Sequence, residues 1–205
     1  PEEYVWIGLG SEGRDEQTLL TDQDNMIIYG QGDGIGQTAE SANGYFLEFS
    51  NRAVERLHNV GFEKCKGGVM PSNEKWRGSM DAWKRRLEER ITYDKGIFES
   101  LDVIILTDAR CIYGKKQLLD GLLDYFFGFL RDNKQVMKEF VETAVLMPTA
   151  LSFFGNFKVD KDGEHKDTFN IKLTGWAPLI LSVRMLAINN GIFEVNTLKR
   201  IKLLR

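Results

Sequence analysis

A glycine-containing turn between two apolar segments constrains the fold of this chain most strongly. Gly8, Gly10 and Gly13 close a β-rich run at residues 4–9, and a second β-rich run occupies residues 25–29. Only the eleven residues RDEQTLLTDQD separate Gly13 from the second run. One or two helical turns fit there, whereas a dinucleotide-binding βαβ unit needs a full crossover helix. The glycines therefore do not indicate a dinucleotide site.

The same segment carries groups suited to a metal-bound triphosphate. Asp22 and Asp24 are two positions apart at the mouth of the second strand, where alternate side chains share a face. Such a pair can chelate Mg²⁺, or it can simply cap a turn. Gly10 and Ser11 offer backbone N–H groups and a hydroxyl to phosphate oxygens, and Arg14 can add a guanidinium. The pattern predicts metal-dependent nucleotidyl transfer.

Composition limits the class of protein further. The 205 residues are 42% hydrophobic with a net charge of -3, which is typical of a globular protein. This slight acidity gives no reason to expect a polyanion-binding surface, and it leaves a local basic patch open. Cys65 and Cys111 match no metal or redox spacing, and two histidines without C-x-x-C give a zinc site little support. We expect a reduced, cytoplasmic protein, because no membrane-spanning run or signal peptide is seen.

Hydrophobic patterning divides the chain into two parts. Residues 1–114 read as an α/β domain with a small mixed sheet and helices on one side, and residues 115–205 as a helical bundle. The pattern of the last residues is typical of a helix that continues further, so we expect this chain to be part of a longer protein. The expected elements are strands at 4–9, 25–29 and 62–70, a strand or helix at 101–107, and helices at 38–59, from Ser79, and at 116–131, 133–147 and 176–190.

The basic segment at residues 73–90 has two interpretations. Arg77, Lys84, Arg85 and Arg86 alternate with tryptophans, a pattern also seen in nucleic-acid-binding surfaces. Two glutamates follow at once, so we favour a charged amphipathic helix with its tryptophans packed inward. Nucleic acid is therefore not an expected partner.

The string GSEGRDEQTLLTDQDN at residues 10–25 resembles a family of nucleotidyltransferases found in bacterial proteins beside CBS and cyclic-nucleotide-binding domains. This family belongs to the polymerase-β-like nucleotidyltransferase superfamily and is related to glutamine synthetase adenylyltransferase and PII uridylyltransferase. The resemblance continues at GFEKCKGGVMPSNEKWR, at LTDARCIYG and at the helical stretch with Lys172, Gly175 and Arg184. It therefore covers essentially the whole chain.

The resemblance implies an α+β nucleotidyltransferase core at 1–114 and a substrate-binding-type helical domain at 115–205, truncated at its C-terminus. The implied activity moves a nucleotidyl group from an NTP, ATP or UTP, to a protein or small-molecule acceptor with Mg²⁺ or Mn²⁺. Attached CBS or cyclic-nucleotide-binding domains and a role in signal transduction are implied as well, without a membrane.

The position of a third carboxylate stays open. Superfamily members carry one on a later strand, and the 62–70 segment offers only Glu63. Asp108 is the first candidate, because its D-x-R-x-x-x-G neighbourhood resembles a segment of the uridylyltransferase relatives, and Asp102 is the second. Lys66, like Lys64, is either a phosphate contact or an ordinary edge-strand lysine.

Because the third carboxylate is not assigned to one residue, an alternative function has to be considered. Without a third acid, the domain would be a nucleotide-sensing regulatory module that does not turn over. A protein-interaction domain with a vestigial site is a weaker alternative. If Asp22 and Asp24 faced away from any binding region, neither the nucleotidyltransferase nor the nucleotide-sensing module would have a basis.

Overall fold

A computed structural model of the chain describes residues 3–19, 21–30, 39–93, 97–145, 151, 156–159, 162 and 166–205. These residues form two compact units, Pro1–Asn133 and Lys134–Arg205. The division falls later than the boundary expected after Gly114, because the helix α5 (Lys116–Asp132) packs on strands β1 and β3 and on helix α3 of the first unit. The mixed α and β character of the fold is confirmed.

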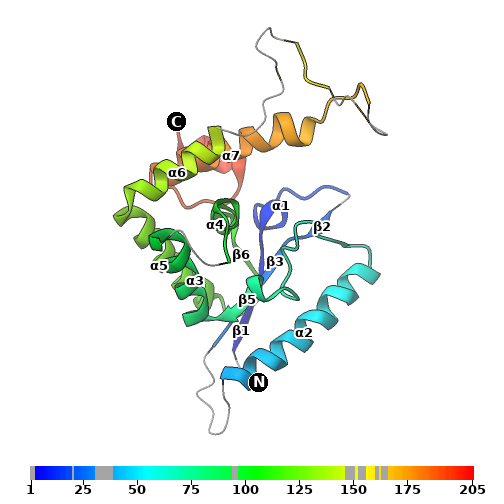
Figure 1. The fold of residues 1–205 in the computed structure, drawn as a ribbon, viewed down its shortest axis with the longest axis vertical. Coiled ribbons are helices and arrows are strands. Elements are labelled where there is room, and N and C mark those ends of the chain that lie inside the picture. Colours follow the sequence, from blue (N-terminus) through cyan, green and yellow to red (C-terminus); the bar gives the residue numbers. More distant parts are fainter. Residues whose placement is uncertain are drawn as a thin grey trace. The chain divides into compact units, whose positions relative to one another are not determined.

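The first unit is built on a four-stranded mixed sheet (Figure 1). Its order is β5-β3-β1-β6, with β1 antiparallel to both neighbours and β5 parallel to β3. The strands are β1 (Tyr4–Gly8), β3 (Asn25–Tyr29), β5 (Arg77–Ser79) and β6 (Arg110–Gly114). Two short strands, β2 (Asp22–Gln23) and β4 (Glu63–Lys64), pair in parallel as a separate sheet.

Helices cover both faces of the sheet (Figure 1), so the expectation of helices on one side was wrong. On one face, α2 (Ala39–Asn59) packs Phe46 flat on Tyr29, with ring centroids 4.4 Å apart. On the other lie α3 (Met80–Tyr93) and α5, and Trp83 of α3 donates its indole N–H to the Ile27 carbonyl. Every residue of β3 is buried, as expected for a strand covered on both faces.

The segments at 101–107 and 62–70, both considered as strands from the sequence, contain little or no strand. The segment expected as strand or helix at 101–107 is helical, with α4 (Ser100–Ile105) followed by the short 3₁₀ turn η2 (Leu106–Asp108). Glu99 and Asp102 form a capping box that starts α4. Within 62–70 only Glu63–Lys64 is a strand, since the chain then turns at Gly68, whose φ is +69°.

The turn between β1 and β2 contains α1 (Gly10–Gly13), a single helical turn. The Gly13 N–H donates to the Leu9 carbonyl at 2.9 Å, which closes the turn. A Cβ on Gly13 would lie 2.8 Å from the Gly8 carbonyl oxygen and in hard contact with that of Asp108. Glycine at this position therefore lets α1 pack directly on η2.

We expect Gly13→Ala to lower the free energy of unfolding by about 3 kcal/mol, because the new methyl group meets two backbone oxygens that cannot rotate away. Gly44→Ala is the matched control, since a Cβ there meets nothing within 4 Å in the middle of α2. That substitution should raise stability by about 0.5–1 kcal/mol through helix propensity. Urea unfolding of both variants checks the opposite signs, and equal effects would contradict the packing argument.

The second unit is helical among its described residues. It contains α6 (Lys134–Val145), the π-helical turn η3 (Lys172–Trp176), α7 (Ala177–Asn189) and α8 (Thr197–Leu203). Helix α7 packs against both α6 and α8, as expected for a bundle. The Asn196 side chain caps α8 by accepting the Lys199 N–H at 3.1 Å. Residues 146 and 147 of the expected helix at 133–147 lie outside the described residues.

Across the described ranges, every helix is too short or too polar to cross a lipid bilayer.

Candidate functional site

The predicted acidic pair lies against the glycine turn. The Leu9 N–H donates to the Asp24 carbonyl at 2.8 Å, which joins the start of α1 to the chain between β2 and β3. Gly10 has a φ of +54°, and a Cβ there would stand 2.5 Å from Oδ2 of Asp24. Only glycine combines this backbone conformation with so close an approach. The Asp24 carboxylate is therefore held directly beside the backbone of α1.

Asp22, Asp24 and Cys65 form a cluster whose ligand atoms all lie within 4.8 Å of one another. The parallel pairing of β2 and β4 sets Asp22 opposite Glu63 and the next residues opposite each other. One step further along each strand brings Asp24 and Cys65 side by side. Burial, followed by the hydrogen bond to Asp24, raises the pKa of the Cys65 thiol to about 11.

The alternate residues of the D-Q-D-N segment fasten it to the protein. The buried Gln23 amide donates to the carbonyls of Val54 at 3.1 Å and Phe62 at 2.9 Å. The Asn25 amide donates to the Glu12 carboxylate at 2.6 Å. These bonds hold the strand on one side, so that the two aspartates converge on the other.

The start of α1 presents backbone donors. The N–H groups of Gly10, Ser11 and Glu12 belong to the first turn and have no acceptor within the helix. At the C-terminal end of α1, the Arg110 guanidinium donates hydrogen bonds to the backbone carbonyls of Glu12 at 2.6 Å and Gly13 at 3.1 Å. Arg110 thus supports the end of α1.

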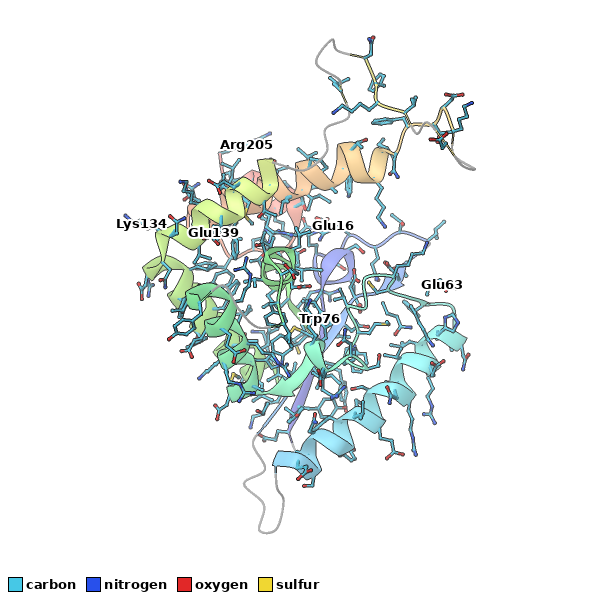
Figure 2. All side chains as sticks on the ribbon, in the orientation of Figure 1. Glu16, Glu63, Trp76, Lys134, Glu139 and Arg205 are labelled. Carbon is cyan, nitrogen blue, oxygen red and sulfur yellow. The ribbon has the colours of Figure 1, made fainter. Side chains whose placement is uncertain are left out.

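Arg14 and Asp108 form an ion pair in the interior. Arg14 Nη1 donates to Asp108 Oδ2 at 2.6 Å, and Nε donates to Glu16 at 2.8 Å (Glu16 is labelled in Figure 2). The Asp108 side chain is 0% exposed and that of Arg14 is 9% exposed. Burial favours a lower pKa for Arg14, but Asp108 and Glu16 outweigh it and raise the pKa. The roles expected for them as acid and phosphate contact stay predictions, whereas the geometry shows them bound to each other.

The remaining candidates do not belong to the cluster. Asp102 caps α4 through the Glu99 N–H at 2.6 Å and pairs with Lys75. Glu63 is exposed near the end of α2 (Figure 2), with its carboxylate 3.6 Å from His58. Lys66 is exposed in the turn that follows Cys65. Among the residues that the structure describes, no third carboxylate joins Asp22 and Asp24.

Cys65 is the residue that sequence reasoning missed. Its distance of 41 positions from Asp24 hides the contact, and one cysteine matches no metal-site spacing. The available signal was the glycine pair that follows it, which marks a tight turn near the expected third strand.

The donor set suits a divalent cation. Two carboxylates within 4.8 Å of each other supply the oxygen ligands that Mg²⁺ and Mn²⁺ accept, and they leave positions for water and phosphate oxygens. The adjoining N–H groups of α1 and the Ser11 hydroxyl offer donors to an anion beside that cation. The arrangement can therefore hold a metal-bound phosphate chain.

Glu12 gives the site a measurable pH dependence. Burial raises its pKa, although the Asn25 hydrogen bond and the Arg110 charge act in the opposite direction. The folded protein then keeps the Glu12 proton to higher pH than the unfolded chain does, so this contribution to stability is lost as pH rises through the folded pKa. We expect Glu12→Gln to lose less stability than the parent as the pH rises from the ordinary pKa of a glutamate through the raised pKa of Glu12.

Urea unfolding across this range checks the Glu12 expectation. Glu48→Gln, on the exposed face of α2, is the control and should follow the parent curve. A Glu12→Gln curve parallel to the parent would contradict a raised Glu12 pKa.

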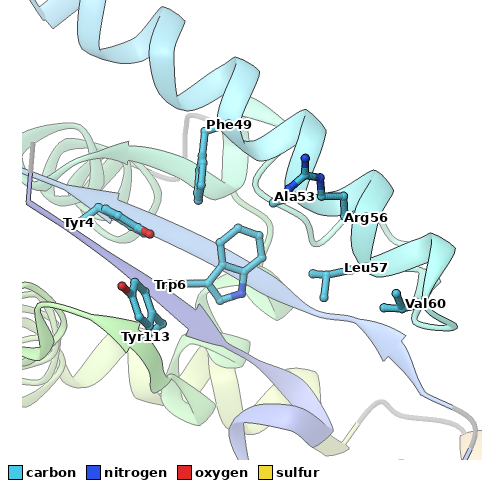
Figure 3. A pocket seen from close by; sticks show the side chains of 8 residues that line it. All are labelled: Tyr4, Trp6, Phe49, Ala53, Arg56, Leu57, Val60 and Tyr113. Atoms are coloured by element: carbon cyan, nitrogen blue, oxygen red, sulfur yellow. The ribbon is translucent and has the colours of Figure 1, made fainter. Parts of the chain in front are cut away.

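An apolar groove of about 410 Å³ lies elsewhere on the first unit (Figure 3). Tyr4, Trp6 and Tyr113 of the sheet face Phe49 and Leu57 of α2 across it. It includes none of the clustered acids and has Arg56 as its one charged lining residue. The groove therefore lacks the ligands that phosphate and metal chemistry requires.

A mixed sheet between helices, with paired carboxylates beside a glycine turn, is an α+β arrangement consistent with a nucleotidyltransferase core. Residues 1–96 match the family described as putative nucleotidyltransferase DUF294. Residues 134–205 match the putative nucleotidyltransferase substrate binding domain DUF294_C, whose match begins where the second compact unit begins. Each of the two compact units thus contains a segment that is similar to a domain described for putative nucleotidyltransferases. A search of curated proteins finds no match.

Proposed function

We propose that this protein transfers a nucleotidyl group from an NTP to a hydroxyl-bearing acceptor, with a divalent cation held by Asp22 and Asp24. The observation that carries the proposal is that the Asp22 and Asp24 carboxylates converge in one cluster, in which Asp24 lies beside Gly10 at the start of α1. The family matches support the same class of reaction. ATP and UTP are the candidate donors, and Mg²⁺ or Mn²⁺ is the candidate ion.

Different residues of the first unit bind the ion and the phosphates in this proposal. Asp22 and Asp24 hold the ion that, when bound, neutralises triphosphate charge and supplies electrostatic stabilisation. The Gly10 and Ser11 N–H groups and the Ser11 hydroxyl orient the phosphate chain. Lys66 follows Cys65 and is exposed, and we propose it as a contact of the outer phosphates. Transfer breaks the bond between the α- and β-phosphates, releases pyrophosphate and joins the α-phosphate to the acceptor oxygen, whose proton passes to solvent.

Arg14 and Asp108 act as positioning residues in this proposal. Their ion pair lies under α1, since Gly13 packs on the Asp108 backbone, and it fixes the turn that carries the phosphate donors. Asp108 is fully buried and already accepts the Arg14 guanidinium, so its carboxylate is withdrawn from an acceptor hydroxyl that arrives from solvent. The sequence-based roles in deprotonation and phosphate contact are therefore less favoured than a role in fixing α1.

A nucleotide-sensing module is the second candidate function. The absence of a third carboxylate among the described residues around Asp22 and Asp24 favours it. In that case the domain binds NTP and metal and reports occupancy to attached domains, for which CBS or cyclic-nucleotide-binding domains are the candidates. We propose a protein or small signalling molecule as acceptor if turnover occurs, and the cytoplasm as the compartment.

Calorimetric titration of ATP, UTP, GTP and CTP, with and without Mg²⁺ or Mn²⁺, tests both functions. Incubation with α-phosphate-labelled NTP and a cell extract, followed by pyrophosphate release, then separates them. Metal-dependent binding with label transfer supports the transferase, and binding without release of pyrophosphate supports the sensor. A folded protein that binds no NTP would contradict both.

A further inference from the structure

The Cys65 thiol lies close enough to the Asp22 and Asp24 carboxylates for all three side chains to bind one ion. Its sulfur and the two carboxylate oxygens all lie within 4.8 Å of one another, a spread that one cation can bridge. The parallel register of β2 and β4 places Cys65 there, and the chain turns three residues later at Gly68, whose N–H donates to the Cys65 carbonyl at 3.0 Å. The thiol is thus fixed by backbone structure and half-buried.

A set of two carboxylates and a thiol discriminates between cations. Mg²⁺ takes oxygen ligands and makes little use of sulfur. Zn²⁺, Co²⁺ and Cd²⁺ accept thiolate together with carboxylate oxygen, and three protein ligands leave an open position for water or substrate. The two classes of ion would therefore use this site differently.

We propose that Cys65 is a third metal ligand that makes the site selective for thiophilic divalent ions of the zinc class. This inference rests on the proposed metal site at Asp22 and Asp24 and adds a selectivity that the carboxylates alone lack. Mg²⁺ is held by the two aspartates only. A thiophilic ion is held by all three side chains, and the thiol proton passes to solvent as the sulfur–metal bond forms.

Cobalt titration followed by near-ultraviolet absorption tests the proposal, because a sulfur-to-cobalt charge-transfer band appears only when a thiolate is bound. We expect the band in the parent protein and in Cys111→Ser, whose cysteine lies on β6 opposite Ile7. Cys65→Ser should lose it and bind Co²⁺ and Cd²⁺ at least roughly tenfold more weakly. Cys111→Ser should also bind Mg²⁺ with ATP as the parent does, because Cys111 lies outside the cluster. Asp24→Asn should lose the band and the Mg²⁺-dependent binding together.

The outcomes separate this inference from the proposed function. A band that persists in Cys65→Ser, or Co²⁺ bound by the parent without a band, overturns the role of Cys65 and leaves the transferase proposal standing. A folded parent that binds neither Co²⁺ nor Mg²⁺ with ATP overturns both. Cys65→Ala is measured alongside, with thermal unfolding of each variant, so that a folding defect in one substitution is not mistaken for loss of a ligand.

Discussion

Asp24→Asn is expected to abolish Mg²⁺-dependent binding of ATP while the protein stays folded. The substitution keeps the size of the side chain that faces Gly10 and removes one of two negative charges beside the proposed ion. Because a bound metal contributes several kcal/mol to reactions of this class, we expect turnover to fall by on the order of 100-fold or more. Calorimetry and pyrophosphate release measure the two effects.

Glu63→Gln is the matched control for this prediction. Glu63 lies opposite Asp22 in the β2–β4 pair, but it is exposed and stands outside the cluster. It should bind Mg²⁺ and ATP as the parent does, because an exposed charge is screened by solvent. An equal loss in both variants would show that general negative charge, rather than the Asp22–Asp24 pair, attracts the metal. Undiminished binding by Asp24→Asn would contradict the metal site.

Asp108→Asn is expected to lower the free energy of unfolding by about 3–5 kcal/mol, because it leaves the buried Arg14 guanidinium without its fully buried partner. For a unit of this size the melting temperature should fall by on the order of 10 °C. Calorimetric and urea unfolding measure the loss. Glu16→Gln is the control, and its smaller effect should reflect the more exposed side chain of Glu16.

A double-variant cycle distinguishes the positioning role of Asp108 from a catalytic one. Arg14→Met combined with Asp108→Leu should cost less than the sum of the single substitutions, since neither Arg14 nor Asp108 is then left as a buried charge without the other. If Asp108 instead deprotonated the acceptor, Asp108→Asn would keep the parent melting temperature and lose turnover alone. That result would restore the sequence-based assignment.

Local spacing was enough to predict the centre of the first unit. The eleven residues between Gly13 and Asn25 exclude a crossover helix, and the structure has the single turn α1 there. The helix expected at 38–59 is confirmed as α2, because its apolar residues recur with helical period. Asp22 and Asp24 were predicted to share a face because alternate residues of a strand point to the same side. Their carboxylates do lie in one cluster.

Contacts between distant segments could not be predicted in this way. Arg14 and Asp108 are 94 positions apart, and each alone is typical of a surface site residue. Their pairing depends on how α1 packs on η2, which glycine at position 13 permits. Which faces of the sheet are covered likewise depends on where α2, α3 and α5 pack against the sheet.

The sequence by itself determined the strand–turn–strand unit, the paired aspartates and the amphipathic helices, because each follows from backbone geometry over a few residues. Only the tertiary structure decided that Cys65 joins the aspartates, that Asp108 is buried on Arg14, and that the first unit extends to Asn133. The physical reason is that strand register and helix packing bring together side chains whose separation along the chain carries no periodic signal.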